Sequence, residues 1–168
     1  MKSSELLIDG FGRVAQTARR VLDGLDQDAL TYRIDDEANT IAWLTWHLTR
    51  IQDDHLASAF GAEQVWVSQG WSQQFDLPFD NAATGYAHTA EEVAAVRTPA
   101  ALLLGYLDAS HAQTVEYLGT VTDADLDRIV DTSWNPPVTL AVRLISVISD
   151  GLQHAGQAAF VRGTYQRR

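Results

Sequence analysis

The sequence predicts an all-α protein, a four-helix bundle with a long ordered crossover between the second and third helices. Four stretches repeat apolar residues at helical spacing, and no stretch shows a convincing strand pattern. Capping residues and glycines lie at the ends of these stretches, as expected for helices. The 168 residues, 46% of them hydrophobic, suit one domain with a substantial core, which we place at residues 1–168.

The first two periodic stretches predict helices over about residues 4–24 and 41–59. The segment between them, DQDALTYRIDDEAN, is polar and acidic, which predicts a loop. Asn39 or Thr40 can cap the second helix, which should end before Gly61. Its inward-facing stripe should contain Trp43, Leu44, His47, Leu48 and Ile51, with Asp54 or His55 at its end.

Residues 61–88 show no sustained period but carry five aromatic side chains. A loop of this length in a compact domain is usually functional or disordered, and the aromatic content argues against disorder. We therefore expect an ordered crossover that covers one mouth of the fold.

The second half of the chain predicts two more long helices. TAEE, at residues 89–92, is a capping-box pattern for a short helix. Thr98 as N-cap, with Pro99 at the first helical position, begins the third long helix, which should end at Gly119. Residues 122–138 predict at most a short helical turn, over TDADLDRIV, and an irregular segment, DTSWNPPV. Thr139 then caps the last helix, which should run to about Arg162.

Composition excludes several classes of function. The net charge of −10 disfavours nucleic-acid binding, because phosphate backbones repel an acidic chain. The chain has no cysteine, so it has no disulfide, thiolate ligand or cysteine nucleophile of its own. No apolar run approaches the roughly 18 residues of a membrane span. The N-terminal segment lacks the apolar region of a signal peptide, so we expect a cytoplasmic protein with no membrane partner.

The segment ISDGLQHAGQAAF holds the strongest candidate for chemistry. Asp150 and His154 are four residues apart and therefore share one face of the last helix. His47 lies mid-stripe on the second helix, so the three side chains can converge if these helices pack together. Two imidazoles and one carboxylate form a ligand set for a divalent metal, zinc or Fe(II), with positions left open. The alternative is a pair between Asp150 and Arg143, with His154 as a hydrogen-bonded core histidine.

Other candidates are weaker. His55 is expected near the helix end or the rim of the site, His88 in a loop, and His111 on the surface. The sequence contains no HExxH, no glycine-rich phosphate loop and no GxSxG motif.

The motifs WLTWHL and, about a hundred residues later, DGLQHAGQ resemble those of the DinB/YfiT-like metalloproteins. The resemblance covers nearly the whole chain. Many members use three histidines, whereas this chain has Asp150 where the first histidine of the final pair usually stands. Mycothiol-dependent maleylpyruvate isomerase is similar in having a glutamate there. NTIAWLTWHLTRIQDDHLA and ISDGLQHAGQAAFVRG look most like the actinobacterial branch that includes mycothiol S-transferases.

The resemblance implies an up-and-down bundle in which His47, Asp150 and His154 bind the metal. It implies zinc, with nickel or iron as alternatives, and a low-molecular-weight thiol, mycothiol first, as co-substrate. The expected function is metal-dependent transfer of this thiol to an electrophile, in detoxification or stress response. A homodimer is compatible with the resemblance. A hydrolase that uses metal-bound water and a non-catalytic metal-binding stress protein remain as alternatives.

Several residues near the expected ligands have proposed accessory roles. Arg143 could orient Asp150 or meet a substrate carboxylate, and Gln157 could hydrogen-bond a ligand's outer atom. For Arg50 a surface or interhelical ion pair is the preferred interpretation, and for Trp43 core packing. Trp46, Trp66 and Trp71 are candidates for the wall of the electrophile pocket.

Overall fold

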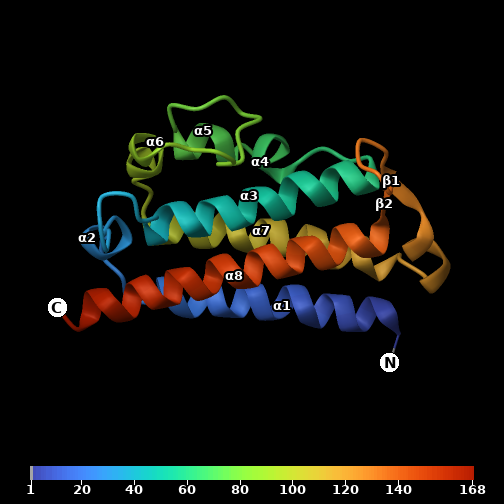
Figure 1. The fold of residues 1–168 in the computed structure, drawn as a ribbon, viewed down its shortest axis with the longest axis horizontal. Helices are drawn as coiled ribbons and strands as arrows, with labels where there is room; N and C mark the ends of the chain where they lie inside the picture. The colour runs from blue at the N-terminus through green and yellow to red at the C-terminus, as the bar shows by residue number, and fades with distance from the viewer. Residues whose placement is uncertain (1) are drawn as a thin grey trace.

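The computed structural model describes residues 2–168, and four long helices dominate that part of the chain (Figure 1). They are α1 (Ser3–Leu22), α3 (Ile41–Phe60), α7 (Ala100–Gly119) and α8 (Leu140–Gln166). Each long helix packs against two of the others, in the cyclic order α1–α8–α3–α7. The predicted all-α fold is confirmed.

The direction of the helices follows from the residues that meet between them. Arg50 and Phe60 of α3 contact Tyr106 and Tyr117 of α7, so these two helices are parallel. The contact between His47 and His154 makes α8 antiparallel to α3. The expected up-and-down order therefore fails at one connection. The crossover after α3 returns the chain to the end of the bundle where α3 began, so α7 runs in the same direction as α3.

The crossover is ordered and contains α4 (Val65–Ser68), α5 (Trp71–Phe75) and α6 (Ala90–Ala95). The capping box predicted before α6 is present, since Thr89 and Glu92 exchange both hydrogen bonds. The segment lies along the side of α3 rather than over one mouth of the bundle (Figure 1). Its aromatic residues pack on α3 and α7, which explains this position.

The helix boundaries lie close to those predicted. Thr40 caps α3 by accepting from the backbone N–H of Trp43, and Gly61 ends it at φ +65°. Thr139 caps α8 in the same way. Two boundaries differ: Pro99 is the N-cap of α7 rather than its first residue, and α8 continues past Gly163 to Gln166. One helical glycine costs only about 1 kcal/mol, and the last turn packs Tyr165 against Tyr32.

Outside the crossover, three short elements were not predicted. Asp26 caps α2 (Gln27–Leu30), which buries Ala29 and Leu30. After η1 (Asp123–Asp127), strands β1 (Ile129–Asp131) and β2 (Val138–Thr139) pair antiparallel, with Ile129 opposite Thr139. Elements of two to four residues are too short to show a period, so apolar spacing does not reveal them.

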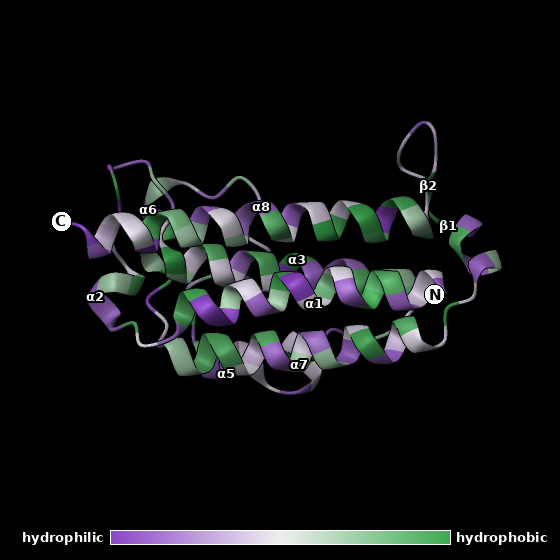
Figure 2. Cartoon of the chain, turned by 90° about the horizontal axis from the view of Figure 1, so that it is seen from below, coloured by the Kyte–Doolittle hydropathy of each residue, from purple (hydrophilic) through white to green (hydrophobic). Residues whose placement is uncertain are grey.

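Buried apolar residues of the long helices form the core, and hydrophobic and hydrophilic residues alternate along these helices (Figure 2). The largest fully buried side chains include Trp46, Arg50, Tyr106 and Phe11. None of the helices within residues 2–168 combines the length and apolar character needed to cross a membrane.

Candidate metal centre

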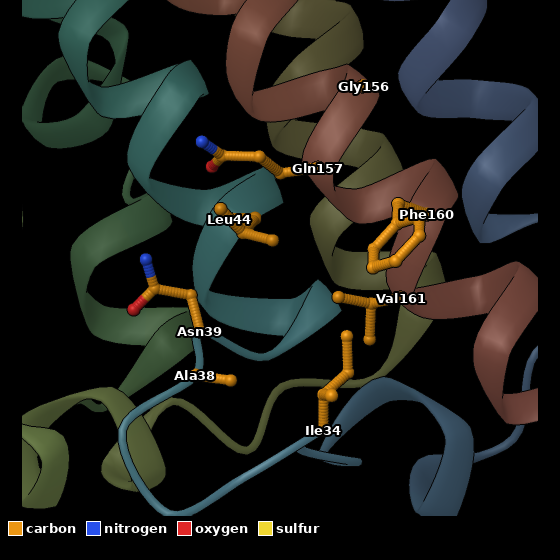
Figure 3. Close-up of a pocket in the computed structure, with 8 residues that line it drawn as sticks. All are labelled: Ile34, Ala38, Asn39, Leu44, Gly156, Gln157, Phe160 and Val161. Carbon is orange, nitrogen blue, oxygen red and sulfur yellow. The ribbon is translucent and has the colours of Figure 1, made fainter.

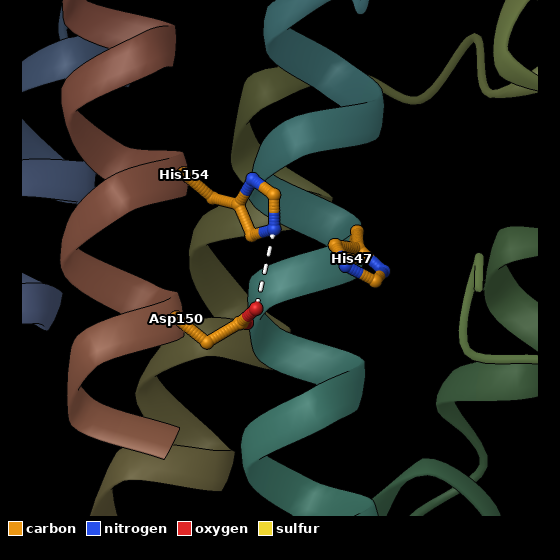
Figure 4. A group of neighbouring side chains, drawn as sticks. All are labelled: His47, Asp150 and His154. Atoms are coloured by element: carbon orange, nitrogen blue, oxygen red, sulfur yellow. Dashed lines mark ion pairs between the residues drawn. The ribbon is translucent and has the colours of Figure 1, made fainter. Parts of the chain in front are cut away.

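His47, Asp150 and His154 lie together in the groove between α3 and α8 (Figure 4). Asp150 and His154 are one turn apart on α8, and His47 reaches them from α3. One potential ligand atom from each residue lies within 4.8 Å of the other two. Asp150 Oδ1 is 3.4 Å from His154 Nε2. The convergence predicted from helical spacing is present, and the three residues could hold a metal ion.

The His47 ring is held by a stacking contact and by a hydrogen bond. It stacks on Trp43 at 4.6 Å between ring centroids, and Nδ1 lies 2.5 Å from the carbonyl oxygen of Thr84. A carbonyl oxygen only accepts hydrogen bonds, so Nδ1 carries the proton and donates it. The lone pair of the neutral ring is therefore on Nε2, which is the arrangement that metal-binding histidines use.

Gly85 allows the crossover to approach His47 this closely. Its φ is +95°, and a Cβ placed there would lie 2.8 Å from His47 Nδ1 and 3.0 Å from Trp46. Real Cβ atoms do not approach so near, so a side chain at residue 85 would displace the histidine. Sequence analysis missed Thr84 and Gly85, because nothing in their local pattern shows which helix they cover.

His154 is oriented by Gln157. Gln157 Oε1 lies 2.9 Å from His154 Nδ1, one turn farther along α8. This contact directs Nε2 of His154 toward Asp150. Each histidine thus has its Nδ1 held by an oxygen, which leaves Nε2 for a cation.

Asp150 has an oxygen that the rest of the protein does not satisfy. Its Oδ2 is buried and finds no hydrogen-bond partner among the described residues. A partly buried carboxylate without a full set of partners is costly, and a cation beside it would remove that cost. The donor set and this free oxygen fit a divalent ion better than they fit a closed ion pair.

The protonation preferences of the three residues differ. Burial lowers the pKa of His47, which keeps the ring neutral. The hydrogen bond with Asp150 raises the pKa of His154. Burial acts to raise the pKa of Asp150, but the hydrogen bond and charge of His154 outweigh it and lower that pKa. His154 therefore binds a proton more tightly than an ordinary histidine does, and a bound cation would take the place of its Nε2 proton.

Arg50 holds the crossover in place over the site. Its side chain is fully buried and donates to the carbonyl oxygens of Ala83 and Asn81, and to Gln64. We expected Arg50 to form a surface or interhelical ion pair. That expectation is wrong, because the side chain is buried and its hydrogen bonds go mainly to the crossover. The side chain does reach Tyr106 on α7, but its contacts with Ala83 and Asn81, at 3.1 and 3.2 Å, fix the loop that carries Thr84.

Asp53, which sequence analysis did not single out, anchors the start of the same crossover. It accepts hydrogen bonds from the backbone N–H groups of Val65 and Trp66 and from the Tyr106 hydroxyl. Burial raises its pKa, and these donors oppose the rise. Asp53 and Arg50 together tie both ends of the 64–83 segment to α3.

Comparison with known proteins shows the family of the chain. The mycothiol S-transferase family matches residues 7–166. The chain belongs to the mycothiol S-transferase family. The crystal structure of a conserved protein from Enterococcus faecalis is similar over 96% of both chains, at 31% identity and a TM-score of 0.89. No curated protein matches the sequence significantly.

Arg143 of this mycothiol S-transferase family protein does not bind Asp150. It forms an ion pair with Asp131 of β1, at 2.6 Å, and donates to His55 Nδ1 at 3.2 Å. The expected orienting contact with Asp150 is therefore absent among the described residues. Arg143 and His55 nevertheless lie at the site, because both line a cavity of about 250 Å³ that includes His47 and Asp150.

The tryptophans expected to form an electrophile pocket lie elsewhere. Trp46 and Trp66 are buried in the core between α3 and the crossover. Trp71 packs against that core, where Gly105 of α7 makes room for its ring. Trp43 is buried as expected, but it also supports His47.

The three remaining histidines lie outside the ligand group. His88 is in the crossover, where it accepts a hydrogen bond from Trp43 Nε1 and packs on Phe79. His111 is a partly buried residue of α7. His55 is at the rim of the site, as the residue spacing suggests.

Proposed function

We propose that this protein is a metal-dependent thiol S-transferase. The observation that carries the proposal is the His47–Asp150–His154 group, in which each Nδ1 is held by an oxygen of the protein. Membership in the mycothiol S-transferase family supports mycothiol as the thiol.

Three protein ligands leave at least one position open on a tetrahedral ion, which suits a catalytic site. We propose zinc first, with nickel and iron as alternatives, because imidazole and carboxylate ligands accept all three. Two neutral histidines and one carboxylate would leave a divalent ion with one net positive charge. When bound, such an ion lowers the pKa of a nearby thiol and so favours the thiolate.

The residues around the proposed ligands provide a cavity for the thiol and orient the two imidazole rings. The chain has no cysteine, so the nucleophilic sulfur comes from the co-substrate. The polar cavity beside Asp150, with His55, Arg143 and Ser146 in its wall, can receive a hydrophilic thiol. Thr84 and Gln157 keep both imidazole rings oriented throughout.

The transfer step conserves atoms and electrons. With 1-chloro-2,4-dinitrobenzene as the test electrophile, the thiolate sulfur forms a bond to the ring carbon that carries chlorine. The carbon–chlorine bond breaks, chloride leaves with the bonding pair, and the thiol proton passes to solvent. We propose detoxification of such electrophiles, or a related stress response, as the cellular role.

A homodimer belongs to the same proposal. Val142, Ile145 and Leu152 are large apolar residues exposed along one outer face of α8. Such a stripe can pair with a second copy of the helix. Light scattering on the purified protein distinguishes a dimer from a monomer.

The experiment combines metal analysis with an activity assay. Purified protein should contain a divalent metal and consume chlorodinitrobenzene only when mycothiol is present. Asp150→Ala and His154→Ala should lose the metal and the activity together. Asp108→Ala and His111→Ala, on α7, are the matched controls and should retain both.

Three outcomes would contradict the proposal. Full activity after removal of the metal would exclude a role for the ion in the reaction. Turnover of an ester or amide without any thiol would favour a hydrolase. Bound metal without turnover of either kind would favour a non-catalytic metal-binding protein.

A further inference from the structure

A second cavity opens on the other side of the ligand group, between α8, the start of α3 and the loop before it (Figure 3). Its volume is about 460 Å³. Its lining residues are Ile34, Ala38, Asn39, Leu44, Gly156, Gln157, Phe160 and Val161. The volume lies within the range of roughly 300–1,000 Å³ that small-molecule sites occupy.

This cavity and the ligand group share a residue. Gln157 lines the cavity and also contacts Nδ1 of His154. Leu44, on the opposite wall, lies one turn before His47 on α3. A molecule in the cavity therefore lies about one helical turn, ~5 Å along the axis, from the ligand group.

The chemistry of the walls selects an uncharged, apolar ligand. None of the lining residues is ionisable, and most are aliphatic or aromatic. Phe160 is 64% exposed and Ile34 is 40% exposed, so two large apolar side chains stand in water at this cavity. Burying such surface against a ligand is favourable. The cavity beside Asp150 differs in having ionisable side chains in its wall, those of His47, His55 and Arg143 among them, next to apolar residues such as Ile51 and Val147.

We propose that the apolar cavity binds the electrophile, while the polar cavity across the ligand group receives the thiol. This inference rests on the proposed transferase function and adds the class of substrate: a neutral aromatic or branched alkyl electrophile. Asn39 and the amide NH₂ of Gln157 can donate to a nitro or carbonyl oxygen, the kind of group that activates such molecules. The Trp46–Trp66–Trp71 wall, expected from the sequence, is thereby replaced by Ile34, Leu44 and Phe160.

Gly156 provides a direct test by filling the cavity. A Cβ at this position would meet nothing within 4 Å, so Gly156→Leu projects into the cavity without disturbing the helix backbone. Gly12→Leu is the matched control, because Gly12 also lies in a long helix with open space around it. The probe is 1,3-dinitrobenzene, which has the shape of the test electrophile but no leaving group, measured by equilibrium dialysis.

Gly156→Leu should weaken binding of 1,3-dinitrobenzene by about tenfold, which is the effect of one well-placed steric conflict. Gly12→Leu should bind it like the original protein. Phe160→Ala removes an exposed side chain from the cavity and should also weaken binding. This variant provides the test if Gly156→Leu does not fold. Equal binding by Gly156→Leu, Phe160→Ala and the control would overturn the proposal.

Kinetics separate this inference from the transferase proposal. In the metal-loaded enzyme, Gly156→Leu should raise KM for chlorodinitrobenzene and leave KM for the thiol and the metal content unchanged. A rise in KM for the thiol instead would overturn the division between the cavities. If the protein binds dinitrobenzene specifically but has no transferase activity, the proposal that the cavity binds such a ligand stands and the transferase proposal is rejected.

Discussion

His47 Nδ1 lies 2.5 Å from the carbonyl oxygen of Thr84, so a crossover residue 37 positions later in the chain orients a ring on α3. The contact requires that the crossover lie directly against the helix. Arg50 makes this possible by donating hydrogen bonds to the carbonyl oxygens of the loop. Gly85 makes it possible because it has no side chain that would collide with His47. The geometry of the candidate metal centre thus depends on residues that are not among its proposed ligands.

Gly85→Ala should disturb the metal centre directly. The new Cβ would lie 2.8 Å from His47 Nδ1, and φ of +95° is itself unfavourable for alanine. We expect a loss of about 1–3 kcal/mol in unfolding free energy from strain alone, together with weaker zinc binding. Denaturant unfolding and competition with a chromophoric chelator measure the two effects. Gly24→Ala is the control, because Gly24 has φ of +71° but open space around it. Equal zinc affinity in both variants would contradict the role assigned to Gly85.

Gln157→Ala should weaken zinc binding without removing a ligand. Its side chain holds Nδ1 of His154, and loss of such an outer partner typically lowers metal affinity by about 10- to 100-fold. Gln153→Ala, one turn earlier on α8, removes only an exposed contact with Ser149 and should leave the affinity unchanged. Chelator competition on both variants is the measurement, and identical affinities would show that Gln157 does not support His154.

Arg50→Ala should be among the most destabilising single changes in the protein. It would leave the carbonyls of Ala83 and Asn81 without their buried donor and remove the positive charge 3.9 Å from the Asp53 carboxylate. Breaking a buried charged network of this kind costs about 3–5 kcal/mol. Urea unfolding should show this loss, whereas Arg13→Ala, which breaks an exposed pair with Asp9, should change little. Comparable midpoints for the two variants would refute the anchoring role.

Zinc affinity should fall on acidification in an order set by the two histidines. The hydrogen bond that His154 donates to Asp150 raises the pKa of His154 above its ordinary value of 6.5, whereas burial lowers that of His47. Protons should therefore compete with the metal at His154 first, beginning above pH 6.5. NMR titration of the ring protons in metal-free protein, beside zinc binding over the same pH range, tests this order. A lower titration midpoint for His154 than for His47 would contradict it.

The same shifts predict opposite effects on the stability of the metal-free protein. The raised pKa of His154 gives stability that is present at low pH and is lost as the pH rises through that pKa. The lowered pKa of His47 acts in the other direction, because the folded protein resists protonation of a buried ring. In Asp150→Asn the first contribution should disappear, so that unfolding free energy no longer falls as the pH rises through the titration of His154.

Local information in the sequence determined the long helices and indicated the three proposed ligands. Thr40, Gly61 and Thr139 mark their ends by backbone hydrogen bonds that involve near neighbours only. The four-residue spacing of Asp150 and His154 likewise places both on one face without reference to the rest of the fold. The two short strands and α2 have too few residues to show an apolar period, although Asp26 caps α2 locally.

Only the tertiary structure decided what surrounds the ligands. Arg143 turned to Asp131 and His55 because the β1–β2 hairpin brings a carboxylate to it, an element too short to predict. Trp46 and Trp66 entered the core because the crossover lies along α3, and the apolar cavity formed instead between Ile34 and Phe160. Helical periodicity depends on neighbours within a few residues, so the sequence by itself determined which side chains share a face. The packing of distant segments decided which of those faces meet, because it depends on the shape of the whole core.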